Sequence, residues 1–276
     1  MPFDFNKQII EEFRANRGRV GGPFEGARLL LLTTTGARSG EQHTVPLGYL
    51  HDGGEQVLVI GSANGADRHP AWFHNLVAEP TVNVEDGIFT YEARATVLEG
   101  AEREAAWARA VEADPGWAEY QARTSRVIPV IALKQTGGGP PPASSFGEAL
   151  RMIHDAFRRE LVLIRKEIAE SGPGLGAQLR VNCLTLCQGL HVHHSHEDRG
   201  LFPALSAQHP ELAEVMDRLG AEHEKVAALL ARLQEVVSTG SADTQAVLKE
   251  VEELASAVEQ HLDYEEEQLI PILDGA

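Results

Sequence analysis

Six side chains able to ligate metals stand in the second half of the chain at helical spacings. They are four histidines and two glutamates, namely His154, His193, Glu197, His223, His261 and Glu265. His193 and Glu197 are four residues apart, and so are His261 and Glu265, which places each pair one turn apart on one face of a helix. Eight of the twelve histidines lie between His154 and His261, and this concentration points to a common role.

Each of these side chains falls on the apolar stripe of its helix when residues are placed at about 100° intervals. His154 aligns with Leu150, and His261 aligns with Leu254 and Leu269. A lone histidine on an apolar face is usually a core residue satisfied by hydrogen bonding. Two buried carboxylates are different, because each costs on the order of several kcal/mol without a compensating cation, and no lysine or arginine shares these faces. We therefore predict a dinuclear metal centre.

The ligand types narrow the choice of metal. Imidazole suits iron, zinc, copper or nickel, and carboxylates favour harder ions. The mixed set fits two iron ions, with manganese or zinc possible.

A Gly-, Pro- and Ser-rich segment, TGGGPPPASS at residues 136–145, separates two regions of different pattern. We predict a first domain over residues 1–135, a linker over 136–145 and a second domain over 146–276.

The two domains differ in periodicity, which predicts an α+β chain. Short β-favouring runs such as ARLLLLTTT, QVLVIGS and RVIPVIALK fill the first half, with helices near residues 5–17, 70–79 and 101–114. They indicate a small, mostly antiparallel barrel. Helical spacing fills the second half, with breaks at residues 171–174, near His209 and Pro210, and at 238–243. This predicts an up-down four-helix bundle.

Charge and composition restrict the partners. The formal net charge of −17 disfavours nucleic acid and anionic membrane surfaces. No apolar run reaches the roughly 20 residues needed for membrane insertion as a helix, and the N-terminal segment lacks signal-peptide features, so we expect a cytoplasmic protein. Cys183 and Cys187, four residues apart in a helical pattern, are expected to be small buried residues.

The second half resembles hemerythrin-like (HHE) cation-binding domains over residues 146–274. The resemblance rests on the HxxxE spacing of His193 and Glu197, followed by DRGLFPAL, and on HLDYEEEQLIPIL near the end. It implies the same six ligands, with both glutamates bridging the metals. Ala227, one turn after His223, stands where oxygen-carrying hemerythrins have a further histidine. His194 could replace that ligand or lie in the shell around the ligands.

The first half resembles the deazaflavin (F-420)-dependent nitroreductase family of split β-barrels over roughly residues 7–134. The motifs are TTTGARSGEQHTVPLGYL and VLVIGSANGADRHPAWFHNLVAEPTVNVE. The resemblance implies a bound deazaflavin coenzyme F-420, with FMN as the alternative. The cofactor contacts that it implies are Arg38, Ser39, Thr44, Val45, Pro46, Gly61, Ser62, Ala63, Trp72 and Asn75.

The chemistry of the turn at Arg38 and Ser39 agrees with that expectation. A guanidinium, a hydroxyl and backbone amides can together hold a phosphate or carboxylate tail. Such proteins often carry a basic residue near Ala63, a role that Arg68 could fill here. Trp72 is either a cofactor contact or an apolar plug of the barrel.

These features lead to three hypotheses. In the first, hydride from the reduced coenzyme supplies electrons to the iron centre, which reduces oxygen, peroxide or nitric oxide. In the second, the barrel reduces a quinone or nitro compound and the bundle senses oxygen or iron. In the third, the chain only binds cofactor and iron. The expected partner is a small-molecule electron acceptor or oxygen, in a possible homodimer. The cofactor carries the chemistry, so no catalytic side chain is predicted.

Overall fold

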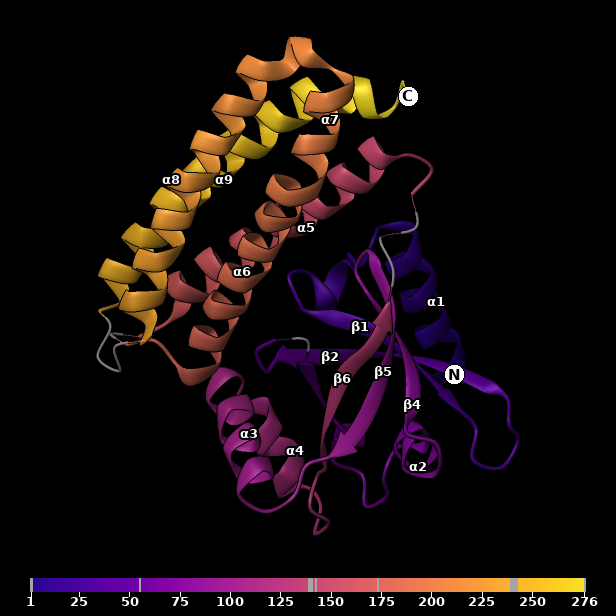
Figure 1. Ribbon diagram of the computed structural model, residues 1–276. Coiled ribbons are helices and arrows are strands. Elements are labelled where there is room, and N and C mark those ends of the chain that lie inside the picture. The colour runs from indigo at the N-terminus through magenta and orange to yellow at the C-terminus, as the bar shows by residue number, and fades with distance from the viewer. Residues whose placement is uncertain are drawn as a thin grey trace. The chain divides into compact units, whose positions relative to one another are not determined.

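The computed structural model describes residues 2–54, 56–138, 141, 143–172, 174–238 and 243–275, with side chains from residue 5 onward. The chain forms two compact units, Met1–Pro142 and Ala143–Ala276 (Figure 1). The last barrel strand continues to Gly138, so it takes up the first residues of the predicted linker, of which 139, 140 and 142 lie outside the described residues.

Six strands close into an antiparallel barrel in the first unit. They are β1 (Leu29–Thr35), β2 (Gln42–His51), β3 (Gln56–Ile60), β4 (Thr81–Asp86), β5 (Phe89–Val97) and β6 (Val130–Gly138). Their order around the barrel is β1-β2-β3-β6-β5-β4, and β4 pairs with β1 to close the ring. The predicted antiparallel barrel is confirmed.

Strand β1 is apolar on both faces because each face has a partner. Leu30 and Leu32 point into the barrel core, whereas Leu29 and Leu31 pack with Phe13 of helix α1 (Pro2–Ala15). Successive side chains of a strand face opposite sides, so one short apolar run covers both layers.

The described part of this unit also contains the α-helices α2 (Ala71–Ala78), α3 (Gly100–Ala113) and α4 (Gly116–Ala122). Trp72 and Leu76 of α2 belong to the barrel core and plug it. Helix α4 was not predicted, because it has only seven residues.

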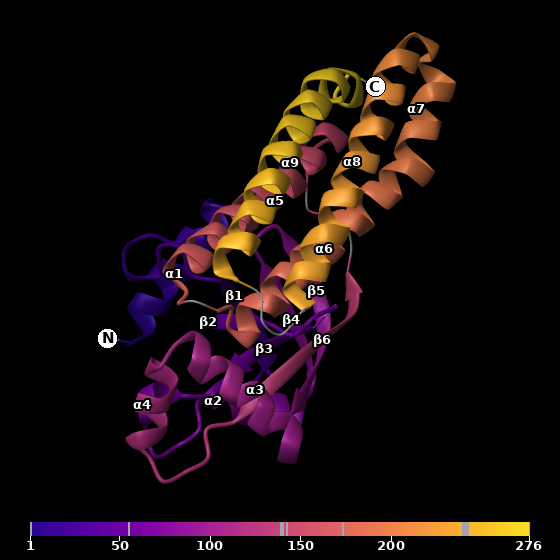
Figure 2. The same cartoon turned by 90° about the vertical axis from the view of Figure 1, so that its left-hand side faces the viewer.

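The second unit is all-helical, as predicted (Figures 1 and 2). Its elements are α5 (Phe146–Glu170), α6 (Ala177–His196), a π-helical segment (Glu197–Leu201), α7 (Phe202–Gln208), α8 (Ala213–Ser238) and α9 (Thr244–Leu273). The Ser145 side chain caps α5 by accepting a hydrogen bond from the amide of Glu148. The long helices bury a shared apolar core that includes both cysteines.

The second helix of the bundle is not continuous. One π-helical segment joins α6 to α7, and there the amide of Phe202 donates to the carbonyl of Glu197, five residues earlier. Such turns rotate the following side chains relative to an α-helix and occur frequently at functional sites. This one lies at the C-terminal member of the HxxxE pair.

Among the described residues, no helix is both long and apolar enough to cross a membrane.

Candidate metal centre and cofactor pocket

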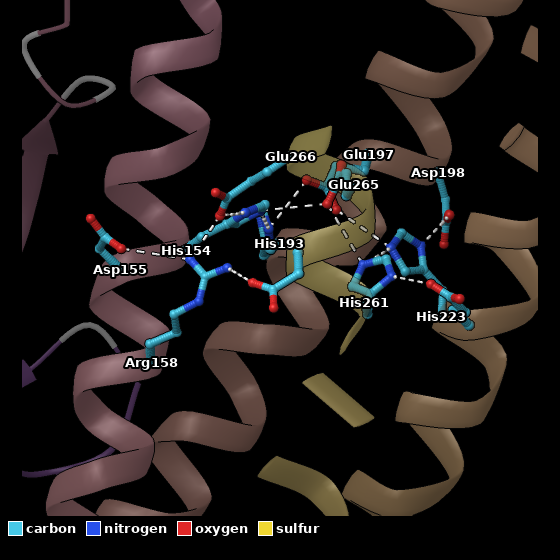
Figure 3. A network of polar contacts seen from close by, with 12 residues as sticks. His154, Asp155, Arg158, His193, Glu197, Asp198, His223, His261, Glu265 and Glu266 are labelled. Carbon is cyan, nitrogen blue, oxygen red and sulfur yellow. Dashed lines mark hydrogen bonds and ion pairs between the residues drawn. The ribbon is translucent and has the colours of Figure 1, made fainter. Parts of the chain in front are cut away.

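The bundle brings the six predicted metal ligands to one place, from four helices and the π-helical segment (Figure 3). Potential ligand atoms form two groups, each lying within 4.8 Å: His154, His193, Glu197 and Glu265 in the first, and His194, His223 and His261 in the second.

Glu197 reaches both groups. Its Oε1 lies 3.1 Å from Nε2 of His193, and its Oε2 lies 3.6 Å from Nε2 of His223. Burial, followed by the nearby charge of Glu265, raises the pKa of Glu197 to about 10. This carboxyl is therefore neutral at pH 7 unless a cation compensates its charge.

Glu265 spans the groups in the same way. Its Oε2 lies 3.5 Å from Nε2 of His154 and 3.6 Å from Nε2 of His261, and burial raises its pKa to about 8. Among the described residues, no backbone amide, lysine or arginine donates a hydrogen bond to the side-chain oxygens of Glu197 or Glu265, which face each other and the histidines. Buried oxygens without donors are unfavourable in an empty site and suitable as ligands of a cation.

Outer carboxylates orient three of the histidines. The Nδ1–O distances are 2.9 Å for His154 and Glu266, 2.7 Å for His223 and Asp198, and 3.1 Å for His261 and Glu222. Since a carboxylate accepts, each Nδ1 carries the proton and each Nε2 presents a lone pair to the centre. The Nε2 atoms of His223 and His261 are only 3.0 Å apart. A cation between the lone pairs would relieve their repulsion.

The outer carboxylates share a pattern, and their contacts with the histidines were not predicted from the sequence. Each is the chain neighbour of an inner residue, yet each serves a histidine on another helix: Asp198 follows Glu197, Glu222 precedes His223, and Glu266 follows Glu265. Helix geometry predicts that the side chain of Glu266 is exposed to solvent. Instead, its side chain is 21% exposed and hydrogen-bonded to His154.

His194 lies inside the second group. Its ring stacks on His223 with centroids 4.2 Å apart, and its buried Nε2 has no hydrogen-bond partner in the described part of the chain. Burial lowers the pKa of His194, so the imidazole is neutral and its Nε2 can serve as a ligand. His191 and His196, by contrast, are exposed.

The first unit contains a cavity of about 830 Å³ at the β1–β2 hairpin and helices α1 and α2. Of the predicted cofactor contacts, it is lined by Arg38, Ser39, Thr44, Val45, Trp72 and Asn75. Its wall also contains Lys7, His43 and His74, which sequence reasoning did not single out. Lys7 carried no signal of its own, because only the fold brings α1 to the hairpin.

Asn75 fixes the shape of the hairpin. Its Oδ1 accepts from the amide of Ala37 at 3.1 Å, and its Nδ2 donates to Thr34 Oγ1 at 3.1 Å. In the described residues, the amides of Arg38 and Ser39 make no hydrogen bond, and both residues line the cavity. Gly36 permits this compact turn, since a Cβ there would lie 2.4 Å from Ser39 Oγ.

Pro46, Gly61, Ser62 and Ala63 do not line this cavity. The last three belong to a turn with positive φ at Ala63 (46°) and Asn64 (55°), a region that residues other than glycine rarely adopt.

Arg126 stabilises that turn. Its guanidinium donates to the carbonyls of Gly61, Ser62 and Ala66 at 3.1, 2.7 and 2.8 Å. The basic residue next to the turn is thus Arg126, and the exposed Arg68 does not line the cavity.

Comparison with known proteins assigns each unit to a protein family. The family model described as F420H(2)-dependent quinone reductase matches residues 6–135. An F420H(2)-dependent quinone reductase of Mycobacterium tuberculosis strain H37Rv is 36% identical over 125 residues, which cover 44% of this chain and 83% of the relative. The chain belongs to the F420H(2)-dependent quinone reductase family. Its predicted character as a deazaflavin-dependent oxidoreductase is thereby confirmed at the level of the family.

Two further matches complete the comparison. An F420H(2)-dependent quinone reductase from strain CDC 1551 of that species shows the same identity and coverage. A solved structure, titled as an F420-H2 dependent reductase called FDR-A, is 44% identical, covers 39% of this chain and 94% of that chain, and has a TM-score of 0.36.

The bundle matches the model of the hemerythrin HHE cation binding domain over residues 146–273. Both resemblances seen in the sequence are therefore confirmed. The chain joins a reductase domain to a hemerythrin-like domain.

Proposed function

We propose that this chain is a two-domain oxidoreductase that binds reduced F420 in the barrel and two iron ions in the bundle. One observation carries the metal half. Glu197 and Glu265 are buried without a backbone, lysine or arginine donor to their carboxyl oxygens in the described residues, and each lies against histidines of both groups.

The cavity suits a cofactor with an apolar ring and an anionic tail. Arg38, Lys7 and the amides of the hairpin supply positive charge and donors, while Val45 and Trp72 supply apolar surface. Reduced deazaflavin, when bound, supplies a hydride. The protein orients it and excludes water. Gly61, Ser62, Ala63 and Pro46 remain predicted contacts at the ring.

A quinone is the proposed acceptor of the barrel. A relative named as a quinone reductase aligns with 125 residues of this chain over 83% of its own length, and the family model of that name matches residues 6–135. This similarity supports a quinone as the acceptor. Reduction of a quinone to the quinol requires a hydride, which bound reduced F420 would supply, and one proton.

The two groups of potential ligands in the bundle support two neighbouring metal positions. His154 and His193 would hold one ion, His194, His223 and His261 the other, and the two glutamates would bridge them. Two irons, when bound, supply one-electron redox chemistry toward oxygen, peroxide or nitric oxide. The protein's share is to hold the imidazoles in the tautomer that presents Nε2.

Metal content tests the bundle. We expect about two irons per chain in protein purified without chelator and analysed by mass spectrometry, as two ligand groups require. His193→Ala should lose metal, whereas His191→Ala, an exposed histidine two residues earlier, should retain it. Manganese or zinc in place of iron would correct the metal assignment, and protein without metal would refute the centre.

Cofactor binding tests the barrel. We expect reduced F420 to bind more tightly than FMN, and Arg38→Ala to weaken F420 binding. Arg68→Ala is the matched control, because this exposed arginine does not line the cavity. Equal loss in both variants would show that general charge, and not the hairpin, attracts the cofactor.

Electron transfer between the domains is the finer part of the proposal. We expect reduced F420 to drive oxygen or peroxide consumption that is lost in Glu197→Ala while quinone turnover persists. Quinone turnover without any consumption in the unaltered protein would favour the alternative, in which the bundle senses oxygen or iron. A cofactor that is never oxidised would favour a binding module. The homodimer also stays a prediction, which light scattering tests.

A further inference from the structure

Two of the outer carboxylates are themselves held by arginines at the surface of the bundle. The first chain of contacts is Arg158–Glu266–His154, and the second is Arg218–Glu222–His261. One of these chains of contacts ends at each of the two groups of potential metal ligands. This inference rests on the proposed metal centre and concerns the residues behind its ligands.

The first clamp joins α5 to α9 (Figure 3). Arg158 Nη1 lies 2.7 Å from Glu266 Oε1, the same oxygen that accepts from His154 Nδ1 at 2.9 Å. The other arm of Arg158 donates to Asp263 at 2.7 Å, also on α9. The guanidinium is thus held at two points, and its orientation determines where the Glu266 carboxylate lies.

The second clamp joins α8 to α9. Arg218 Nε donates to Glu222 Oε1 at 2.9 Å, and Glu222 Oε2 accepts from His261 Nδ1 at 3.1 Å. The Arg218 guanidinium lies 3.5 Å from the ring centre of Tyr264, one helical turn from His261. This stacking restrains the Arg218 side chain, which is 55% exposed.

Other arginines of the bundle make ion pairs without reaching the centre. Arg165 on α5 pairs with Glu252, and Arg232 on α8 pairs with Glu250 and Glu253. In the described part of the bundle, these pairs include no histidine. They provide a matched control on each of the two helices.

We propose that Arg158 and Arg218 are positioning residues for the metal centre. Each keeps a glutamate oriented as the acceptor of a ligand histidine, so that Nε2 of His154 and of His261 faces its ion. A carboxylate behind a ligating imidazole fixes the ring and strengthens it as a donor, and a rigid carboxylate does so better than a mobile one. These ion pairs are partly or largely exposed, like the control pairs, and such pairs contribute little to folding, so the benefit should appear mainly in metal retention.

The test compares Arg158→Gln and Arg218→Gln with Arg165→Gln and Arg232→Gln in the full chain. We would load each variant with ferrous iron without oxygen and measure the rate of iron transfer to a colorimetric chelator. We would also measure unfolding midpoints with and without iron by circular dichroism.

The two clamp variants should lose iron about three- to tenfold faster than the control variants, less than the roughly tenfold to hundredfold effect typical of removing an outer carboxylate itself. Their metal-free midpoints should match the controls, and only the increase on iron loading should shrink. Arg158→Lys keeps the positive charge but lacks the two arms of the guanidinium, so it should recover part of the iron retention. It also provides a second variant should Arg158→Gln not fold.

Each result has a distinct meaning. Clamp variants that release iron at the control rate would overturn this inference while leaving the centre intact. Equal losses of the metal-free and iron-loaded midpoints would show a purely structural role and would overturn it as well. Unaltered protein that holds no iron would instead overturn the proposed function on which the inference rests.

Discussion

Metal binding by this bundle should release protons. Burial raises the pKa of Glu197 to about 10 and that of Glu265 to about 8, so both carboxyls are protonated at pH 7 in the metal-free protein. Burial lowers the pKa values of His154, His193 and His223, so these imidazoles are neutral at pH 7 and release no proton. Ligation requires carboxylates, and the two protons must leave as metal enters.

The magnitude follows from those two pKa values. Metal binding should release about two protons at pH 7 and about one at pH 8.5, where Glu265 is already mostly ionised. Apparent affinity should therefore rise by about 100-fold per pH unit near pH 7. The sign is opposite for folding of the metal-free protein, because a raised carboxyl pKa stabilises the metal-free fold below the unfolded pKa. That contribution disappears as the pH rises through the folded pKa values.

Calorimetric titration with manganese, without oxygen, provides the assay. Enthalpies measured in two buffers of different ionisation enthalpy yield the number of protons released. Glu252→Gln, which alters a surface glutamate paired with Arg165, is the control and should release the same number. Release of no protons at pH 7 would refute the reasoning, since the two carboxyls would then already be ionised in the empty site.

Three further predictions concern other parts of the chain. Asp198→Asn should lower metal affinity by about tenfold to hundredfold, because it replaces the carboxylate acceptor 2.7 Å from His223 Nδ1 with a weaker one. Competition with a chelator measures the affinity, and an unchanged value would contradict the role of Asp198 in orienting His223. Asn75→Ala should weaken cofactor binding about tenfold, because it removes a hydrogen bond worth about 1 kcal/mol or more that holds the hairpin amide of Ala37. A fluorescence titration tests this, and His51→Ala is the control because His51 does not line the cavity. Cys187 should resist iodoacetamide at pH 8 in the native protein, because burial raises the pKa of its thiol to about 12; rapid modification would show that the helix opens.

Much of this molecule could be predicted from its residues. The periods of two and 3.6 in the apolar pattern distinguish barrel from bundle, because they reflect which faces of a strand or helix must be buried. The HxxxE spacings place His193 with Glu197 and His261 with Glu265, since residues one turn apart share a face. For the same reason, the histidines on apolar stripes could be assigned to the interior.

Only the tertiary structure decided which residues from different elements meet. Asp198, Glu222 and Glu266 look like solvated carboxylates in the sequence, yet each reaches a histidine on another helix because of how the helices pack. The cavity beside Lys7 likewise depends on α1 lying against the β1–β2 hairpin. Helical periodicity determines which face a side chain occupies, but the neighbour of that face follows from packing between segments distant in the chain.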